Sequence, residues 1–171
     1  FKMVFSEFNN KVVLITGAAG GIGDALCRKF SEYNARVYGT DIKHVDGPNF
    51  IQGDISDQGF TQKLVKQITD KENRIDILVN NAGVCPRTSL FDITYDEWRK
   101  VMDINLTSTF ILSQIVMKIM IQNRSGAIVN LASVAGQVGG IAVGAHYSAS
   151  KAGIECLTKT FAKNGAPFGI R

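Results

Sequence analysis

Short apolar runs alternate with helical patterns along this chain, and this alternation restricts the possible folds more than any other feature of the sequence. Strands that are separated by helices pair as parallel neighbours, because a helical crossover returns the chain to the same edge of the sheet. We therefore predict an α/β fold, a doubly wound, Rossmann-like parallel sheet between two helical layers (three layers, αβα). The expected strands are residues 11–16, 36–40, 50–51, 75–80 and 127–131.

Apolar residues between the expected strands recur three and four positions apart, which indicates helices with one buried face. The expected buried faces are Ile22, Ala25, Leu26, Phe30 and Tyr33, then Phe60, Leu64 and Ile68, then Phe110, Ile111, Ile115, Val116 and Ile119, and finally Ile154, Leu157, Thr158 and Phe161. Thr94 and Glu97 have the spacing of a capping box at a helix start. Trp98 follows at once, and we expect it to anchor that helix in the core.

Length and composition exclude several other classes of protein. With 171 residues, 45% of them apolar, the chain is expected to form one domain over residues 1–171. It has no run near the roughly 18 apolar residues of a membrane span, and we expect no signal peptide at its start. Its three cysteines contain no C-x-x-C pair, which predicts free thiols in a reducing compartment and no metal site. The net charge of +4 is dispersed, so we expect a cytoplasmic protein that binds neither nucleic acid nor membranes.

A glycine-rich segment, T-G-A-A-G-G-I-G at residues 16–23, follows the first expected strand and begins the first helix. Glycine permits positive φ and lets the backbone approach a pyrophosphate without a Cβ in the way. The helix N-terminus then offers unpaired N–H groups to the phosphates. Two glycine spacings are open at this point, residues 17, 21 and 23 or residues 17, 20 and 23, and other residues must decide between them.

Asp41 ends the second expected strand, 18 residues after Gly23. A carboxylate at this point can accept hydrogen bonds from the ribose hydroxyls of NAD, and it repels the 2′-phosphate of NADP. Lys43 follows two residues later, but no arginine follows the first loop glycine. We therefore expect NAD as the cofactor and NADP as the less favoured one, with an aspartate in a surface turn as the alternative.

Tyr147 and Lys151 are four residues apart, which places a phenol and an ammonium on the same face of a helix. Carbonyl reduction needs a proton donor at the oxygen, and alcohol oxidation needs the corresponding base. A free tyrosine titrates near pH 10, and adjacent cations would stabilise the phenolate at a lower pH. Ser133 lies 14 residues before Tyr147, just after the fifth expected strand. Asn105 lies in a helical region beyond the segment N-N-A-G at residues 80–83, and either residue alone would be an ordinary cap or surface residue.

These motifs, in this order and at these spacings, resemble the short-chain dehydrogenase/reductase family over almost the whole chain, from Lys11 to Arg171. The matching features are T-G-x-x-x-G-x-G, N-N-A-G, an Asn, a Ser and Y-x-x-x-K. The segment N-N-A-G argues against the extended sugar-epimerase branch, so the glycine spacing 17, 21 and 23 is favoured. The resemblance implies an NAD(P)-dependent oxidoreductase that transfers a hydride between nicotinamide and a carbonyl or secondary alcohol.

The resemblance also implies a role for each matching residue. Tyr147 would be the acid/base, and Lys151 would support it and hold the nicotinamide ribose. Ser133 would hydrogen-bond the substrate oxygen, and Asn105 would position a water in a proton relay. The residues implied for cofactor binding are Gly17, Gly21, Ile22, Gly23, Asp41, Ile42, Asp54, Ile55, Asn81, Ala82, Gly83, Tyr147 and Lys151.

The sequence is compatible with two classes of substrate. A small alcohol, polyol or sugar competes with a 3-oxoacyl group on acyl carrier protein, because Arg124 matches a basic position that such reductases use for their acidic partner. Phe168 stands where those reductases often have a second basic residue, so a small alcohol or carbonyl is favoured. A rival of another class is a non-catalytic NAD-binding sensor or scaffold on the same fold. Such a protein would have no need for the pair of Tyr147 and Lys151.

Further expectations concern the surroundings of the site, the oligomeric state and the extent of the chain. His146 is interpreted as a surface or packing residue, and Cys85 as an inert thiol. By resemblance, the protein is expected to form a homodimer or homotetramer through the helices that carry Asn105 and Tyr147. Relatives continue beyond residues 168–171 through a sixth strand, a substrate-covering helical segment and a final strand. We therefore expect a fold that is truncated after the fifth strand and the following helix, as part of a longer polypeptide.

Overall fold

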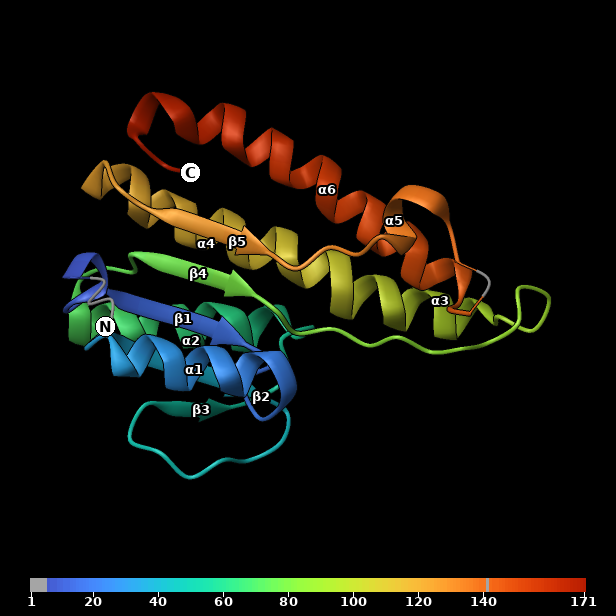
Figure 1. The fold of residues 1–171 in the computed structure, drawn as a ribbon, viewed down its shortest axis with the longest axis horizontal. Helices are drawn as coiled ribbons and strands as arrows, with labels where there is room; N and C mark the ends of the chain where they lie inside the picture. Colours follow the sequence, from blue (N-terminus) through green and yellow to red (C-terminus); the bar gives the residue numbers. More distant parts are fainter. Residues whose placement is uncertain (1–5, 141) are drawn as a thin grey trace, which may run out of the picture.

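The computed structural model describes residues 6–140 and 142–171 and contains a parallel sheet of five strands (Figure 1). The strands are β1 (Val12–Thr16), β2 (Arg36–Asp41), β3 (Phe50–Gln52), β4 (Ile77–Asn80) and β5 (Ala127–Asn130). Their order is β3-β2-β1-β4-β5, so the chain begins in the middle of the sheet, builds one edge and then builds the other. The predicted doubly wound α/β fold is confirmed, and each strand lies within two residues of its expected bounds.

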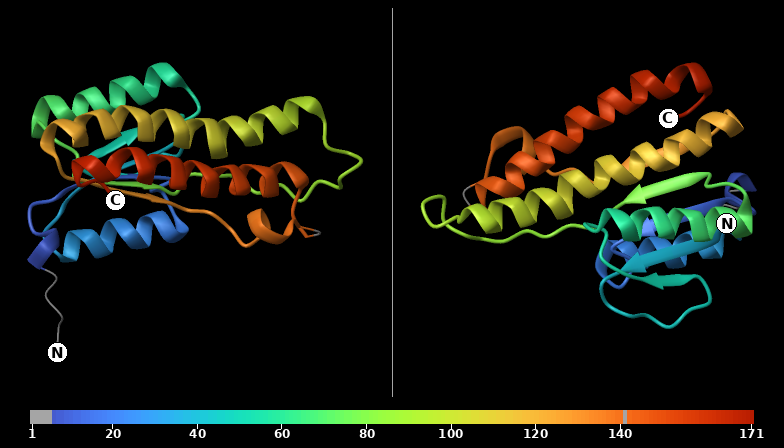
Figure 2. Two further views of the ribbon diagram at one scale, coloured as in Figure 1. Left: turned by 90° about the horizontal axis from the view of Figure 1, so that it is seen from above. Right: turned by 180° about the vertical axis from the view of Figure 1, so that it is seen from behind.

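Helices cover both faces of the sheet. In the described part of the chain they are α1 (Gly21–Glu32), α2 (Gln58–Glu72), α3 (Tyr95–Met102), α4 (Ser108–Asn123), α5 (Ala135–Val138) and α6 (Ala145–Gly165). Single turns of other helix types occur at Ser6–Phe8, Asp103–Thr107 and Ala166–Phe168. Figure 2 shows α1 on one face of the sheet and α2 and α4 on the other, with α6 beside α4. This is the expected three-layer arrangement.

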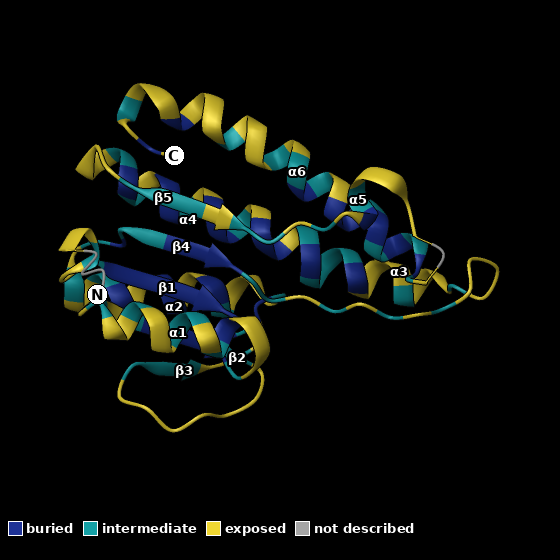
Figure 3. Cartoon of the chain, viewed as in Figure 1, coloured by how far each residue is buried: buried dark blue, intermediate teal, exposed yellow. Residues whose placement is uncertain are grey.

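Strand β1 forms the centre of the core, because all five of its residues are buried (Figure 3). Val12 and Leu14 belong to the cluster under α2 and α4. Val13 and Ile15 belong to the cluster under α1. At the edge strand β5, Val129 is 48% exposed, because α1 covers the central strands of the sheet and leaves this edge strand uncovered. The central strand is therefore enclosed on both faces, as parallel sheets require.

Helix α1 turns a different face to the sheet from the one predicted. Its buried and half-buried face is made by residues at helical spacing, Gly23, Leu26, Cys27 and Phe30. Ile22 is 62% exposed and Ala25 is also exposed, so the prediction that both are buried was wrong. The physical reason is the close approach at Gly23, where an added Cβ would lie 2.0 Å from the carbonyl oxygen of Gly17. This backbone contact sets the rotation of the helix, and apolar spacing alone does not reveal it.

Helix α4 also buries a face beside the predicted one. Its buried residues are Ser108, Thr109, Leu112, Ser113, Val116, Met117 and Met120. Of the predicted stripe, Val116 is fully buried, whereas Phe110 is 40% exposed. The helix is apolar on several sides, so the spacing of its apolar residues could not select one face. Trp98 on α3 is 37% exposed, and the prediction that it anchors the core was wrong.

The second and last expected helices are α2 and α6, and their main core residues are confirmed. Leu64 and Ile68 are buried, with Phe60 packed against the same cluster. In α6, Ile154 is buried, whereas Thr158 is exposed and not part of the core.

The continuous segment Tyr95–Asn123 is long and apolar enough, by length and composition, to cross a membrane. Its buried side packs on the sheet and on α2, as the core helix of a globular domain does, so its composition is weak evidence for a span. Beyond α6, Ile170 forms a parallel bridge with Gly126 beside β5, on the side where a sixth strand is expected.

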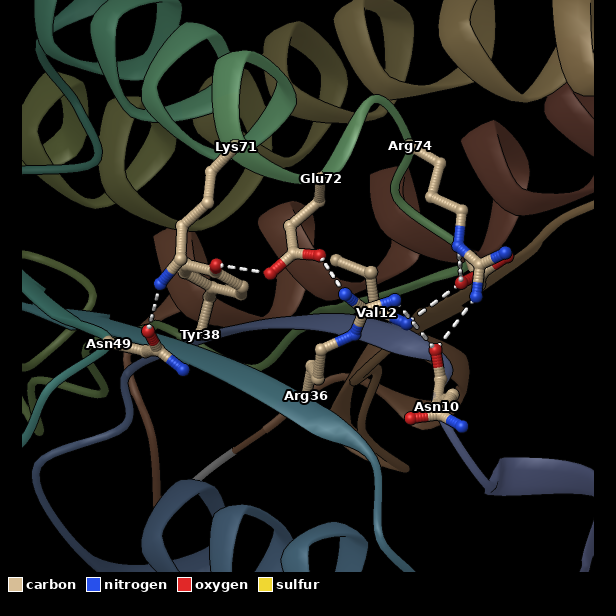
Figure 4. A network of polar contacts seen from close by, with 9 residues as sticks. Asn10, Val12, Arg36, Tyr38, Asn49, Lys71, Glu72 and Arg74 are labelled. Atoms are coloured by element: carbon tan, nitrogen blue, oxygen red, sulfur yellow. Dashed lines mark hydrogen bonds and ion pairs between the residues drawn. The ribbon is translucent and has the colours of Figure 1, made fainter.

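At the amino ends of the strands, polar side chains pair with one another (Figure 4). The Glu72 side chain is 4% exposed, accepts a hydrogen bond from the Tyr38 hydroxyl at 2.7 Å, and lies 2.5 Å from Nη1 of Arg36. Arg74 pairs with Asp76 at 3.0 Å. Burial of the phenol and its hydrogen bond to Glu72 raise the pKa of Tyr38 to about 12. We call these five residues the amino-end network.

Candidate active site

The glycine-rich loop between β1 and α1 adopts a backbone that depends on its glycines. Gly17 and Gly21 have φ values of +67° and +55°, in the left-handed region that favours glycine. A Cβ added to Gly20 or Gly21 would meet no atom within 4 Å, so the outer side of the loop is open. No side chain caps the first turn of α1, where the N-cap residue is Gly20. The loop therefore presents free backbone N–H groups to whatever binds above it.

Beneath the loop, hydrogen bonds join the carboxyl ends of β1 and β4. Nδ2 of Asn81 donates to the carbonyl oxygens of Thr16 at 2.9 Å and Gly17 at 3.0 Å. Oγ1 of Thr16 accepts from the backbone N–H groups of Asn81 at 3.1 Å and Ala82 at 2.9 Å. The segment N-N-A-G thus fixes the floor on which the glycine-rich loop rests.

A cavity of about 590 Å³ lies beyond the carboxyl ends of the strands, beside this loop. Nine of the predicted cofactor residues line it, namely Gly17, Ile22, Asp41, Ile42, Asp54, Ile55, Asn81, Ala82 and Gly83. Eight lining residues were not assigned to the site from sequence, namely Ala19, Gly20, Thr40, Lys43, Gly53, Val84, Lys100 and Ile104. Most of these adjoin predicted residues in the chain, so proximity in sequence could have found them. Lys100 and Ile104 come from α3 and the turn after it, and only the fold brings them to the cavity.

Asp41 stands at the edge of this cavity with its carboxylate held by backbone groups. Oδ2 accepts from the N–H of Ala19 at 3.1 Å, and Oδ1 accepts from the N–H of Lys43 at 3.0 Å. Asp54 is exposed, and its carboxylate accepts from both the N–H and the hydroxyl of Ser56 at 2.8 and 2.7 Å. Both carboxylates are therefore oriented by short loops that follow a strand, as the sequence predicts.

Asn105 is completely buried in the π-helical turn Asp103–Thr107, between α3 and α4. Its Nδ2 donates to the carbonyl of Val84 at 3.0 Å and to Oγ of Ser150 at 3.1 Å, and its Oδ1 accepts from the N–H of Val84 at 2.8 Å. The side-chain amide therefore fixes the chain just after Gly83. Its predicted part in a water relay stays a prediction.

Lys151 is 6% exposed, and its Nζ donates to the carbonyl oxygen of Leu131 at 2.5 Å. Nζ also lies 5.7 Å from the ring centroid of Tyr147, which confirms that the two side chains share one face of α6. Burial lowers the pKa of Lys151, and the nearby Cys85 opposes this change. The Tyr147 hydroxyl makes no hydrogen bond within the described residues, so its proton is free to be exchanged with a ligand.

Three elements meet at Gly83. A Cβ added there would lie 3.3 Å from Oδ1 of Asn105 and 3.8 Å from Nζ of Lys151. Gly83 also lines the cavity, so the cavity leads to the residues predicted to be catalytic, although these do not themselves line it.

Ser133 lies in the turn between β5 and α5. Its Oγ accepts from the N–H of Ala135 at 3.2 Å. Helix α5 packs closely on α6, because a Cβ added to Gly136 would lie 2.7 Å from the backbone nitrogen of Ala152, the residue after Lys151. This packing brings Ser133 to the part of α6 that carries the predicted pair, although Ser133 forms no hydrogen bond with Tyr147 in the described chain.

The loop and the cavity fit an elongated dinucleotide. The open glycine-rich loop with free N–H groups suits a pyrophosphate, and the Asp41 carboxylate suits a ribose diol. From there the cavity extends to Gly83, beside the Lys151 ammonium.

A family model described as short chain dehydrogenase matches residues 11–171. The chain belongs to this family. It is 37% identical over 175 residues to the 3-oxoacyl-[acyl-carrier-protein] reductase FabG of Vibrio cholerae, covering 96% of this chain and 71% of that protein. It is 37% identical over 184 residues to an NAD-dependent glycerol dehydrogenase of Listeria innocua, covering 99% of this chain and 71% of that protein. A crystal structure of gox2181 superposes with a TM-score of 0.89 at 31% identity, covering 99% of this chain and 72% of that chain.

Membership of the short-chain dehydrogenase family makes the chain an oxidoreductase that uses a nicotinamide cofactor, as its motifs predict. Gly21 and Gly23 do not line the cavity, and they act by shaping the loop above it. The roles given to the individual site residues stay predictions.

Proposed function

We propose that this protein uses NAD to interconvert a small secondary alcohol, polyol or sugar and its carbonyl form. The observation that carries the proposal is the Tyr147 phenol beside the buried Lys151 ammonium, at the end of a cavity floored by N-N-A-G. A phenol next to a cation can give or take a proton at a substrate oxygen near neutral pH.

Each part of the proposed site has its own role in binding or proton transfer. The glycine-rich loop would hold the pyrophosphate, Asp41 a ribose, and Lys151 the nicotinamide ribose. When bound, the cofactor supplies or accepts the hydride. Tyr147 donates its proton to the carbonyl oxygen in reduction and takes it back in oxidation, while Ser133 hydrogen-bonds that oxygen. Lys151 is desolvated and therefore acts on the phenol through a medium that screens its charge poorly.

The preference for NAD rests on Asp41. Its carboxylate is already oriented by two backbone N–H groups, so binding a ribose diol would cost little reorganisation. A 2′-phosphate would meet a negative charge at the same place. Lys43 also lines the cavity, two residues after Asp41, and its positive charge favours a phosphate.

The alternative substrate is a 3-oxoacyl thioester, which the name of the Vibrio relative suggests. Arg124 would then meet the acidic carrier protein. Its side chain donates to the carbonyl of Pro167 at 3.4 Å, and its backbone, with φ of +49°, ends helix α4. This structural use of Arg124, together with Phe168 in place of a second basic residue, favours the small substrate.

A turnover screen separates these candidates. NADH and NADPH oxidation would be measured with dihydroxyacetone, a sugar ketone and acetoacetyl-CoA, using the full-length protein. We expect dihydroxyacetone or the sugar with NADH to give the highest kcat/KM. A clear preference for acetoacetyl-CoA would reject the substrate proposal, and NADH binding without turnover of any compound would favour a sensor or scaffold.

We also propose that the protein is cytoplasmic and forms a homodimer or homotetramer through the helical segments that carry Asn105 and Tyr147. Light scattering after size-exclusion chromatography measures the oligomeric state, and a mass of one full-length subunit would reject the proposed oligomer. Fractionation of the source cells tests the cytoplasmic location.

A further inference from the structure

His146, the residue before Tyr147, is completely buried. Its ring folds back over Gly144, where an added Cβ would lie 2.1 Å from Cε1 of the ring. Nδ1 of His146 accepts a hydrogen bond from the backbone N–H of Tyr147 at 2.9 Å. A ring nitrogen that accepts a hydrogen bond carries no proton, so this geometry places the proton of the neutral ring on Nε2.

The other ring nitrogen faces helix α3. Nε2 of His146 lies 3.4 Å from Oε1 of Glu97, at ion-pair distance, and has no hydrogen-bond partner within residues 6–140 and 142–171. The same Oε1 accepts a hydrogen bond from the Thr88 hydroxyl at 2.5 Å. Thr94 still caps α3 by accepting from the Glu97 N–H at 3.1 Å, so the predicted capping box is half formed and the Glu97 carboxylate is turned to Thr88 and His146.

A second contact joins the same two parts of the chain. The N–H of Gly144, the N-cap of α6, donates to the carbonyl of Pro86 at 3.0 Å. Segment 84–88, which follows Gly83, is therefore held to the first turn of α6 at two points. Figure 1 shows α3 beside this first turn, at the end of the molecule away from the N-terminus. Gly83, directly before the segment, lies beside Lys151, because an added Cβ there would be 3.8 Å from Nζ, so the segment begins close to the proposed reaction site.

We propose that His146 is a positioning residue with two separable tasks. Nδ1 fixes the backbone of Tyr147 and with it the phenol, whereas Nε2 acts through Glu97 to hold segment 84–88 as a wall of the substrate site. The inference rests on the proposed role of Tyr147 as acid/base. It predicts that loss of the first contact lowers kcat and that loss of the second raises KM for the carbonyl.

Asparagine and glutamine each replace one of the two nitrogens. His146→Asn keeps an acceptor near the position of Nδ1 but is too short to reach Glu97. His146→Gln can donate to Glu97 but removes the Nδ1 acceptor, so the Tyr147 N–H keeps the carbonyl of Gly144, at 3.1 Å, and loses its contact with the ring. With dihydroxyacetone and acetoacetyl-CoA as probes, we expect KM to rise about five-fold in His146→Asn and kcat to fall about five-fold in His146→Gln, the change expected for the loss of one polar contact.

The chain offers a matched control in its other histidine. His44 is exposed, pairs with Asp46 and does not line the cavity, so His44→Asn and His44→Gln should leave both constants unchanged. Glu97→Gln should raise KM as His146→Asn does, and the double variant should be no worse than either single one, because both remove the same contact. Additive effects would show that Glu97 does not mediate the second task.

A spectroscopic test needs no turnover. Long-range ¹H–¹⁵N correlation spectra of the full-length protein report which ring nitrogen carries the proton, and the His44→Asn and His146→Asn variants assign the two rings. We expect His146 as the Nε2–H tautomer, and a proton on Nδ1 would overturn the inference. Equal losses of kcat, KM and Tm in both His146 variants would also overturn it, because a purely structural role predicts them. An Nε2–H tautomer in a protein that turns over no carbonyl would reject the proposed function instead.

Discussion

The two ends of the parallel sheet use polar side chains in opposite ways. At the amino ends, the members of the amino-end network pair with one another, and the Glu72 carboxylate is shared by Tyr38 and Arg36. At the carboxyl ends, Asp41 and Lys151 are held by backbone groups, and the Tyr147 hydroxyl makes no hydrogen bond within the described chain.

This difference predicts that the amino end contributes mainly to stability and the carboxyl end mainly to the reaction. Side chains that satisfy one another contribute to the free energy of unfolding and have no capacity left for a ligand. Side chains oriented by the backbone keep their reactive atoms available, and the free energy needed to hold them in place comes from packing elsewhere in the fold. Substitutions at the two ends should therefore change different measured quantities.

The largest expected effect is at the carboxyl end. Tyr147→Phe should lower kcat at least about 100-fold, because the proton donor is lost, while NADH affinity and Tm stay nearly unchanged. The matched control is Tyr38→Phe, the same chemical change at the amino end, which should leave kcat unchanged. Stopped assays with dihydroxyacetone and fluorescence titration with NADH measure these quantities. Near-normal turnover of Tyr147→Phe would disprove the acid/base role.

Glu72→Gln should lower stability and leave turnover unchanged, the reverse of Tyr147→Phe. Removing the charge from a side chain that is 4% exposed should lower the free energy of unfolding by about 2 kcal/mol, since Arg36 and Tyr38 both lose a charged partner. Urea denaturation measures the change, with Glu32→Gln on the exposed side of α1 as a control expected to stay within about 0.5 kcal/mol. A fall in kcat/KM at conditions where the variant is fully folded would contradict the separation of the two ends.

Asp41→Ala should change cofactor choice and little else. Loss of the carboxylate should reduce kcat/KM for NADH about ten-fold relative to that for NADPH, because the ribose loses an acceptor and a 2′-phosphate loses a repelling charge. Asp46→Ala removes the same charge from the same loop region at a fully exposed side chain and should leave the ratio unchanged. A wild-type protein that already prefers NADPH would refute the role given to Asp41.

The smallest expected effect is a pH dependence at the amino end. The pKa of Tyr38 is about 12 in the folded chain and near 10 when unfolded, so the unfolded phenol loses its proton first. The stability that Tyr38 contributes is therefore complete below about pH 10 and is lost between pH 10 and 12. We expect Tyr38→Phe to be less stable than the parent by about 1 kcal/mol at pH 8. That difference should disappear by pH 12 in urea titrations, and a constant difference across this range would show that the phenol is not buried as described.

Local patterns in the sequence were sufficient for most of the fold. The strands were found because β-branched runs bounded by glycine and polar residues need no knowledge of their partners. The shared face of Tyr147 and Lys151 follows from helical geometry alone. The open loop at Gly21 follows from the absence of a side chain.

The errors arose where a long-range contact decides the outcome. The face that α1 buries depends on the contact of Gly23 with Gly17. Trp98 is 37% exposed, although its size and apolar character predict a core position. Lys100 reaches the cavity only through the tertiary packing of α3, and no motif marks it. The Glu97 carboxylate that faces His146 belongs to a helix about 50 residues earlier in the chain, so the burial of His146 could not be inferred from its sequence neighbours.

The hydrogen bonds between the ends of β1 and β4 have a consequence for folding during synthesis. They connect residues 64 to 66 positions apart, so the floor of the cavity forms only after β4 has been synthesised and has paired with β1. Contacts of such long sequence separation form late, because loop closure must occur before they contribute any stability. A dinucleotide that recognises this floor binds the native chain and not its early intermediates. At a hundred-fold excess over its Kd it would add about 2.7 kcal/mol to the native state alone. The cellular supply of nicotinamide cofactor would then stabilise the newly made enzyme as well as take part in its reaction.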